Sequence, residues 1–238
     1  MNTATAERRT KAATRSQAPG WLEILAGGGA YLGCMVLVYA LLPLVQDDAV
    51  AGIVGFLVSG IMGIIALAVA ALVRIRGLAA FGIRRAKVRH LLAGAGLGLI
   101  AVVLGIIASS AYTMLSGDTQ NVQTDYQAGA AAGLLGLVLT FTAGSIITPI
   151  GEEAFFRGVV ANALLNRFPA WIAIIASAAI FAVAHGINTV LPVAFVVGIL
   201  TALLYRRTGS IWPGVVLHGV NNATATIVIP HILTATTT

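Results

Sequence analysis

Charged side chains gather at one point in the last third of the sequence, inside an otherwise apolar stretch. Glu152 and Glu153 are adjacent, and Arg157 follows four residues later. A charged residue within a membrane-spanning segment is energetically costly, so it is a candidate for function. The spacing of Glu153 and Arg157, with the acid first, favours an ion pair along one helix face. Glu152 then lies about 100° away on another face, where a buried carboxylate is able to act as a general base.

Two histidines and an asparagine are the remaining candidates for a catalytic site. His185 stands at the end of an apolar run, where a histidine on its own is more often a core or interfacial residue. His218 and Asn222 are four residues apart, so their side chains share one helix face. A polar pair on one transmembrane face must find partners inside the bundle or bind a ligand. Asn221 points elsewhere, and we expect it to make only a helix contact.

The composition of the chain sets the class of element that must position these residues. The chain has 238 residues, of which 58% are hydrophobic and 9% are charged. Its mean hydropathy is +0.95, and its apolar runs reach the length of about 20 residues that a membrane-spanning helix needs. These values, with Cys34 as the sole cysteine, exclude a soluble enzyme, a disordered chain and a disulfide scaffold.

The sequence therefore predicts an all-α, polytopic transmembrane helical bundle of about seven spans. We expect a flexible cytoplasmic tail at residues 1–20 and a single integral membrane domain at 21–238, with a motif-bearing core at about 130–229. The fourth span starts near residue 130 and runs into the glutamate pair. The other expected spans cover about residues 22–45, 50–73, 91–115, 170–186, 190–205 and 211–229.

Basic residues alternate between the connections of these spans. All 14 Lys and Arg residues fall in the N-terminal tail, at 74–90, at 151–169 and at 206–207, and the connections in between carry none. The positive-inside rule then predicts a multi-pass protein of the plasma (inner) membrane with a cytoplasmic N-terminus. Segment 74–90 is expected to lie along the cytoplasmic membrane surface. Because the net charge of +6 sits beside anionic headgroups, we expect the lipid bilayer as the partner and no nucleic acid.

A count along the expected hairpin of the fourth and fifth spans predicts that the candidates meet. Glu152 lies 16 residues before Phe168, near the turn, and His185 lies 17 residues after it. At the helical rise both are about 24–26 Å from the turn. We therefore predict that these side chains converge with His218 and Asn222 on one polar cavity, within the membrane and nearer its cytoplasmic side.

Three motifs resemble those of a known family. Residues 152–158 resemble the EExxxR motif of the CPBP family, the CAAX proteases and bacteriocin-processing enzymes that are also called the Abi family of intramembrane proteases. Residues 181–185 resemble its FxxxH motif, and 218–222 its HxxxN motif. The stretches 205–212 and 81–84 are also similar to family segments. The resemblance implies an intramembrane endopeptidase that hydrolyses a peptide bond of a membrane-associated peptide or protein, as a CAAX-type prenyl endopeptidase does.

The resemblance also implies roles for the motif residues. Glu152 and His185 would activate water, and His218 and Asn222 would stabilise the oxyanion. The first motif is completed by Glu153 and Arg157. The family is often classed as metalloprotease, and a zinc ion held by Glu152, His185 and His218 is the alternative to metal-independent water activation. We favour the metal-independent reaction because the sequence has no HExxH spacing and has Asn222 where some family members have an acid.

Two other functions compete with the protease. A non-catalytic membrane protein that binds a peptide, such as a bacteriocin immunity factor, would keep the fold without needing an ionised Glu152. A small transporter would use the ionisable cluster as a proton relay. Inverted hydropathy repeats would favour a transporter, and the sequence shows none.

Overall fold

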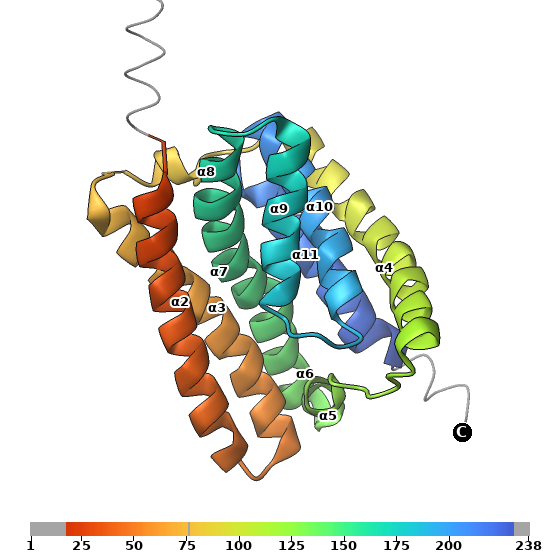
Figure 1. The fold of residues 1–238 in the computed structure, drawn as a ribbon. Helices are drawn as coiled ribbons and strands as arrows, with labels where there is room; N and C mark the ends of the chain where they lie inside the picture. The colour runs from red at the N-terminus through yellow and green to blue at the C-terminus, as the bar shows by residue number, and fades with distance from the viewer. Residues whose placement is uncertain (1–17, 76, 231–238) are drawn as a thin grey trace, which may run out of the picture.

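The computed structural model describes residues 18–75 and 77–230, and all regular elements in these ranges are helical (Figure 1). The all-α class is thereby confirmed. Most of the predicted tail, residues 1–17, lies outside the described residues. The α-helices are α2 (Trp21–Leu41), α3 (Asp48–Val73), α4 (Val88–Ser116), α5 (Thr124–Ala131), α6 (Gly133–Thr142), α7 (Thr148–Phe155), α8 (Asn162–Leu165), α9 (Ala170–Val183), α10 (Leu191–Thr208) and α11 (Trp212–Asn222). The shorter segments are the 3₁₀ turns η1 (Leu42–Leu44) and η2 (Leu78–Phe81) and the π-helical η3 (Ala143–Ile147), η4 (Phe156–Ala161) and η5 (Ala223–Val228).

The helices run up and down between two ends of the bundle (Figure 1). The described basic connections lie at one end, shown at the top of Figure 1 and called here the basic end. The turns between α2 and α3, α4 and α5, and α9 and α10 lie toward the opposite end. All four aspartates of the sequence fall in or beside these turns, so we call this the acidic end.

Five segments of the described chain are long and apolar enough to cross a membrane, which agrees with a polytopic bundle. They are Trp21–Leu44, Asp48–Val73, Val88–Ser116, Gly133–Leu165 and Leu191–Thr208. The two other expected spans fall on α9, which is apolar but has only 14 residues, and on α11 with its continuation η5. For these two segments, a complete crossing stays a prediction.

Glycines let α3 and α7 cross at backbone contact beside the glutamate pair. A Cβ atom added at Gly63 would collide with the carbonyl oxygen of Gly151, and one added at Gly151 would collide with that of Gly60. Small residues permit this close approach of transmembrane helices. The crossing brings Ser59 of α3 to the side chain of Glu152, which directly follows Gly151.

Two of the three motif-bearing helices, α7 and α11, adjoin π-helical segments. The segments η3 and η4 flank α7, and η5 begins directly after Asn222. Pro149, in the first turn of α7, has no backbone N–H to continue the ladder of hydrogen bonds. Such π-helical turns are frequent at functional sites because they change the direction in which neighbouring side chains point.

The described residues of segment 74–90 lie across the basic end of the bundle. Before α4 begins at Val88, their only regular element is the short 3₁₀ turn η2. Phe81 is fully buried, and its carbonyl oxygen would lie 2.7 Å from a Cβ atom at Gly158. Arg84 Nε donates to the carbonyl oxygen of Gly209 at 2.6 Å, and Ser210 Oγ donates to that of Arg84 at 2.7 Å. Segment 74–90 is therefore tied to the turn between α10 and α11, while Arg84 itself stays exposed.

Candidate active site

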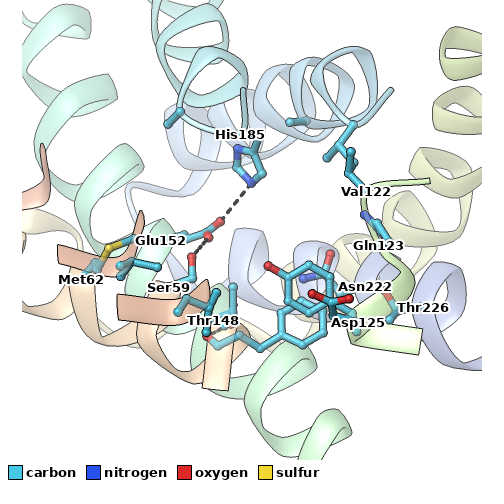
Figure 2. Close-up of a pocket in the computed structure, with 18 of the residues that line it drawn as sticks. Ser59, Met62, Val122, Gln123, Asp125, Thr148, Glu152, His185, Asn222 and Thr226 are labelled. Atoms are coloured by element: carbon cyan, nitrogen blue, oxygen red, sulfur yellow. Dashed lines mark hydrogen bonds and ion pairs between the residues drawn. The ribbon is translucent and has the colours of Figure 1, made fainter. Parts of the chain in front are cut away.

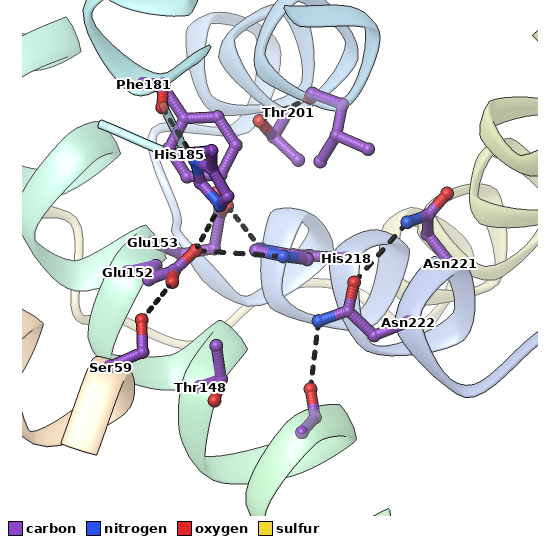
Figure 3. Close-up of polar contacts among 12 residues, drawn as sticks. Ser59, Thr148, Glu152, Glu153, Phe181, His185, Thr201, His218, Asn221 and Asn222 are labelled. Atoms are coloured by element: carbon purple, nitrogen blue, oxygen red, sulfur yellow. Dashed lines mark hydrogen bonds and ion pairs between the residues drawn. The ribbon is translucent and has the colours of Figure 1, made fainter. Parts of the chain in front are cut away.

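Glu152 is the centre of a buried polar cluster on α7 (Figure 3). Its side chain is almost fully buried, and its Oε1 accepts a hydrogen bond of 2.6 Å from Ser59 Oγ. Its Oε2 faces Nε2 of His185 and Nε2 of His218, each at 3.8 Å. Within the described residues, Glu152 Oε2 has no hydrogen-bond partner. One carboxylate oxygen is thus held by the protein, while the other points between two imidazoles.

His185 is held in one orientation by the end of α9. Its Nδ1 donates to the carbonyl oxygen of Phe181 at 2.8 Å, one helical turn earlier. A carbonyl oxygen only accepts, so Nδ1 carries the proton and Nε2 of the neutral ring presents a lone pair. The ring of Phe181 packs edge-on against His185 with centroids 4.6 Å apart. The four-residue spacing of the FxxxH motif is therefore the spacing that this hydrogen bond requires.

Glu153 faces away from the cavity and joins two cationic or polar partners. Its Oε1 lies 3.1 Å from Arg157 Nη1, which confirms the predicted ion pair. The same oxygen lies 3.2 Å from His218 Nδ1, a contact that the sequence analysis did not foresee. The Arg157 guanidinium also lies over the ring of Phe181 at 4.2 Å. Glu153 therefore does more than neutralise Arg157, because it also orients a histidine of the site.

The two asparagines extend the cluster along α11. Asn222 Nδ2 donates to the carbonyl oxygen of Gly144 in η3 at 2.9 Å. Asn221 Nδ2 donates to Asn222 Oδ1 at 3.4 Å, and both asparagines line the same cavity as the Glu152 cluster. Asn221 thus makes a contact within its own helix, as expected, and it also borders the cavity.

The cluster lines a cavity of about 650 Å³ (Figure 2). The structure brings all four predicted residues, Glu152, His185, His218 and Asn222, to this one space. The cavity continues to the exposed side chains of Asp48 and Asp125 at the acidic end. We expected the site nearer the cytoplasmic, basic side, yet the cavity opens toward the opposite end. The reason is the short α9, because the α9–α10 loop stops well short of the lower ends of α2 and α3 (Figure 1).

Sequence reasoning missed two residues of the cavity. Ser59 was not singled out, although a hydroxyl in a strongly apolar span, just before Gly60, was a usable signal. Tyr126 lines the cavity and packs on Phe56 with ring centroids 4.1 Å apart. Burial, followed by the negative charges of Glu152 and Asp125, raises the pKa of the Tyr126 hydroxyl. Tyr126 therefore presents a neutral hydroxyl to the cavity at physiological pH.

The described residues do not form a ready metal centre. Across residues 18–75 and 77–230, no group of three or more His, Cys, Asp and Glu side chains is placed to hold a metal ion. The donor set predicted for zinc, Glu152, His185 and His218, is therefore not arranged as a ligand set in this structure, and we derive no reaction step through a metal.

These features define a polytopic helical membrane protein with a buried glutamate–histidine centre. Residues 134–224 match the model of the Rce1-like family, described as type II CAAX prenyl endopeptidase Rce1-like. The matched segment contains all three motifs, and it confirms the family resemblance inferred from them. At the level of the family, it supports a CAAX-protease-like intramembrane endopeptidase. No curated protein and no solved structure matches the chain.

Proposed function

We propose that this protein is an intramembrane endopeptidase in which Glu152 and His185 activate water to hydrolyse a peptide bond. One observation carries the proposal: the buried Glu152 Oε2 lies 3.8 Å from two imidazole nitrogens and has no hydrogen-bond partner among the described residues. A separation of this size is too long for a direct hydrogen bond but suits a bridging water. A water held there would lie against both a carboxylate and the lone pair of His185.

The chemistry follows from the position of Glu152 as a general base. Glu152 accepts a proton from the water, and the water oxygen bonds to the carbonyl carbon of the substrate, which gives a tetrahedral oxyanion. When the C–N bond breaks, the protonated Glu152 returns its proton to the leaving amine nitrogen. The products are a carboxylic acid and an amine, and Glu152 is again a carboxylate.

His218 and Asn222 are positioned to stabilise the oxyanion. For this role His218 is an imidazolium: its Nδ1–H donates to the Glu153 carboxylate, which only accepts, and its Nε2–H faces the reaction site. Asn222 uses one N–H of its amide for the Gly144 carbonyl, which leaves a second N–H for the substrate. Donors fixed in place before the reaction stabilise developing charge more than mobile water does. Glu153 and Arg157 act through His218 as positioning residues.

The environment and the substrate class complete the proposal. We propose the plasma (inner) membrane as its location, with the N-terminus in the cytoplasm, and the alternation of the basic connections supports this orientation. Its substrate is a membrane-associated peptide or protein, cleaved without a metal ion. Cleavage that survives a strong chelator, in purified protein without stoichiometric metal, supports the metal-independent reaction. Inactivation by the chelator that added zinc reverses would contradict it.

The decisive test compares wild-type cells with cells that carry the Glu152→Gln variant. Membrane peptides that accumulate uncleaved in the variant are identified, and one is then cleaved in vitro by purified wild-type protein. We expect Glu152→Gln to lower turnover at least about a hundredfold while the protein inserts and folds normally. Asp118→Asn, which removes a carboxylate outside the cavity lining, is the matched control and should keep full activity.

Two outcomes would contradict the proposal. Wild-type turnover by the Glu152→Gln variant would show that Glu152 is not the base. Tight binding of a peptide by the wild-type protein with no cleavage would support the peptide-binding protein instead.

A further inference from the structure

The four aspartates at the acidic end divide into two pairs with different surroundings. Asp47 caps α3 by accepting a hydrogen bond from the Val50 N–H at 2.9 Å. Asp118 accepts one from the Gln120 N–H at 3.0 Å. Neither of these two aspartates lines the cavity. The first pair thus has local structural roles that account for a carboxylate.

Asp48 and Asp125 form the second pair: each stands in the first turn of its helix, where a negative charge suits the helix dipole, but neither accepts, from a described residue, a capping hydrogen bond like those of Asp47 and Asp118. Both are exposed, and both line the cavity that leads to Glu152. In the described part of the chain, neither carboxylate takes part in an ion pair, and no side-chain hydrogen bond is made to them. A Cβ atom at Gly52 would collide with the carbonyl oxygen of Asp125, so α5 packs directly on the first turns of α3. Asp48 and Asp125 therefore both lie where α5 packs on the beginning of α3, and both line the cavity there.

Among the described residues, no Lys or Arg lies in the cavity lining to offset this negative charge. The sequence has no Lys or Arg between Arg89 and Arg157, nor between Arg15 and Arg74. Further inside, Oε2 of the buried Glu152 faces the same cavity and has no hydrogen-bond partner in the part of the chain that the structure describes. A cleft of one sign of charge with apolar walls concentrates ligands of the opposite charge.

We infer that the ligand of this cavity is a cationic peptide segment, one with Lys or Arg beside its apolar part, that arrives from the acidic end of the bundle. As a statement about the substrate, the inference rests on the proposed function. Asp48 and Asp125 are then specificity-determining residues that receive the basic side chains at the mouth of the cavity. By the positive-inside rule, the acidic end lies on the extracytoplasmic side of the membrane.

The test uses three synthetic peptides that share one apolar sequence and carry two Lys, two Gln or two Glu at one flank. Binding of each peptide to the Glu152→Gln variant in nanodiscs is measured, so that charge preference is determined without turnover. We expect the Lys peptide to bind about three- to tenfold more tightly than the Gln peptide, and the Glu peptide to bind weakest. Raising the salt concentration should reduce the difference.

Asn substitutions distinguish the contribution of the two cavity-lining aspartates to binding from that of the other two aspartates at the acidic end. Asp48→Asn with Asp125→Asn, added to the Glu152→Gln variant, should remove most of the preference for the Lys peptide. Asp47→Asn with Asp118→Asn is the matched control, because it removes the same charge from the same end and leaves the caps intact, since Asn is an equally good cap. Equal binding of the three peptides, no binding of any of them, or an equal effect of both double variants would overturn the inference.

The failure of this inference and that of the proposed function are distinguishable. Charge-selective binding without cleavage by the wild-type protein would keep the inference and remove the protease. Cleavage without charge preference would do the reverse. The side of arrival is tested with Asp118→Cys in a Cys34→Ser background and a membrane-impermeant thiol reagent. Labelling in intact cells is expected, and labelling only after permeabilisation would overturn the extracytoplasmic arrival.

Discussion

The two ends of the bundle place their carboxylates in different surroundings. At the basic end, the buried Glu23 accepts from Arg74 Nε at 2.8 Å, and Arg84 and Ser210 tie segment 74–90 to the next turn. At the acidic end, Asp48 and Asp125 remain without such partners and border a cavity. A membrane protein has few carboxylates, so those that border a cavity and have no ion-pair partner among the described residues are candidates for function.

The glutamate pair combines both situations, because Glu153 is held in an ion pair and Glu152 faces the cavity. Substitutions of these two residues should therefore give the largest effects. Glu152→Gln is expected to abolish cleavage with little change in the melting temperature, because Gln keeps the volume of the side chain and still accepts the hydrogen bond from Ser59. Glu153→Gln should lower the free energy of unfolding by about 3–5 kcal/mol, because it leaves the buried Arg157 without a counter-charge. Thermal unfolding and peptide cleavage are measured on both variants.

The structure sharpens this contrast, because Glu153 also contacts His218. Glu153→Gln should therefore lower kcat even in the folded fraction of the protein. If its loss of activity were accounted for entirely by the unfolded fraction, the positioning of His218 by Glu153 would be refuted.

Gly151→Ala should have the next largest effect. Its added methyl group would collide with the Gly60 carbonyl, so α3 and α7 must move apart. Overpacking of this kind costs about 1–3 kcal/mol of stability. Because the same crossing brings Ser59 to Glu152, turnover should fall together with the melting temperature. Gly96→Ala, in α4 with open space around the glycine, is the control that should leave both unchanged.

The motifs predict local geometry well because it depends on helical periodicity alone. The Glu153–Arg157 pair and the shared face of His218 and Asn222 follow from four-residue spacings. The contacts of Ser59 with Glu152 and of His218 with Glu153 join residues 93 and 65 positions apart. They depend on where the helices cross, and the positions of these crossings cannot be read from the local spacing of residues in one sequence. The same holds for the direction in which the cavity opens, because it follows from the relative lengths of α9 and its neighbours.

Arg74→Gln tests the claim that the basic end is structural. Glu23 is fully buried, and Arg74 donates to both of its carboxylate oxygens, at 2.8 and 3.1 Å. Leaving a buried acceptor with weaker partners costs about 1–3 kcal/mol, and the cost should lie at the low end because Arg74 is 41% exposed. Stability should fall while kcat/KM of the folded protein stays constant. A reduced kcat/KM would mean that the basic end is coupled to the site.

Ser59→Ala should give the smallest loss of activity among the variants near the site. It tests whether Ser59 orients Glu152 toward the cavity. The hydroxyl of Ser59 holds one oxygen of Glu152 at 2.6 Å, which leaves the other oxygen directed at the two histidines. Without this hydrogen bond the carboxylate is free to rotate, and loss of orientation should lower kcat by about tenfold with KM nearly unchanged. Ser177→Ala is the matched control, since this buried hydroxyl bonds only within its own helix, to the Ile174 carbonyl at 3.0 Å. Both variants should lose similar stability, so a drop in kcat confined to Ser59→Ala would assign the hydroxyl to positioning of the base. An equal drop in both variants would instead reduce Ser59 to a packing residue.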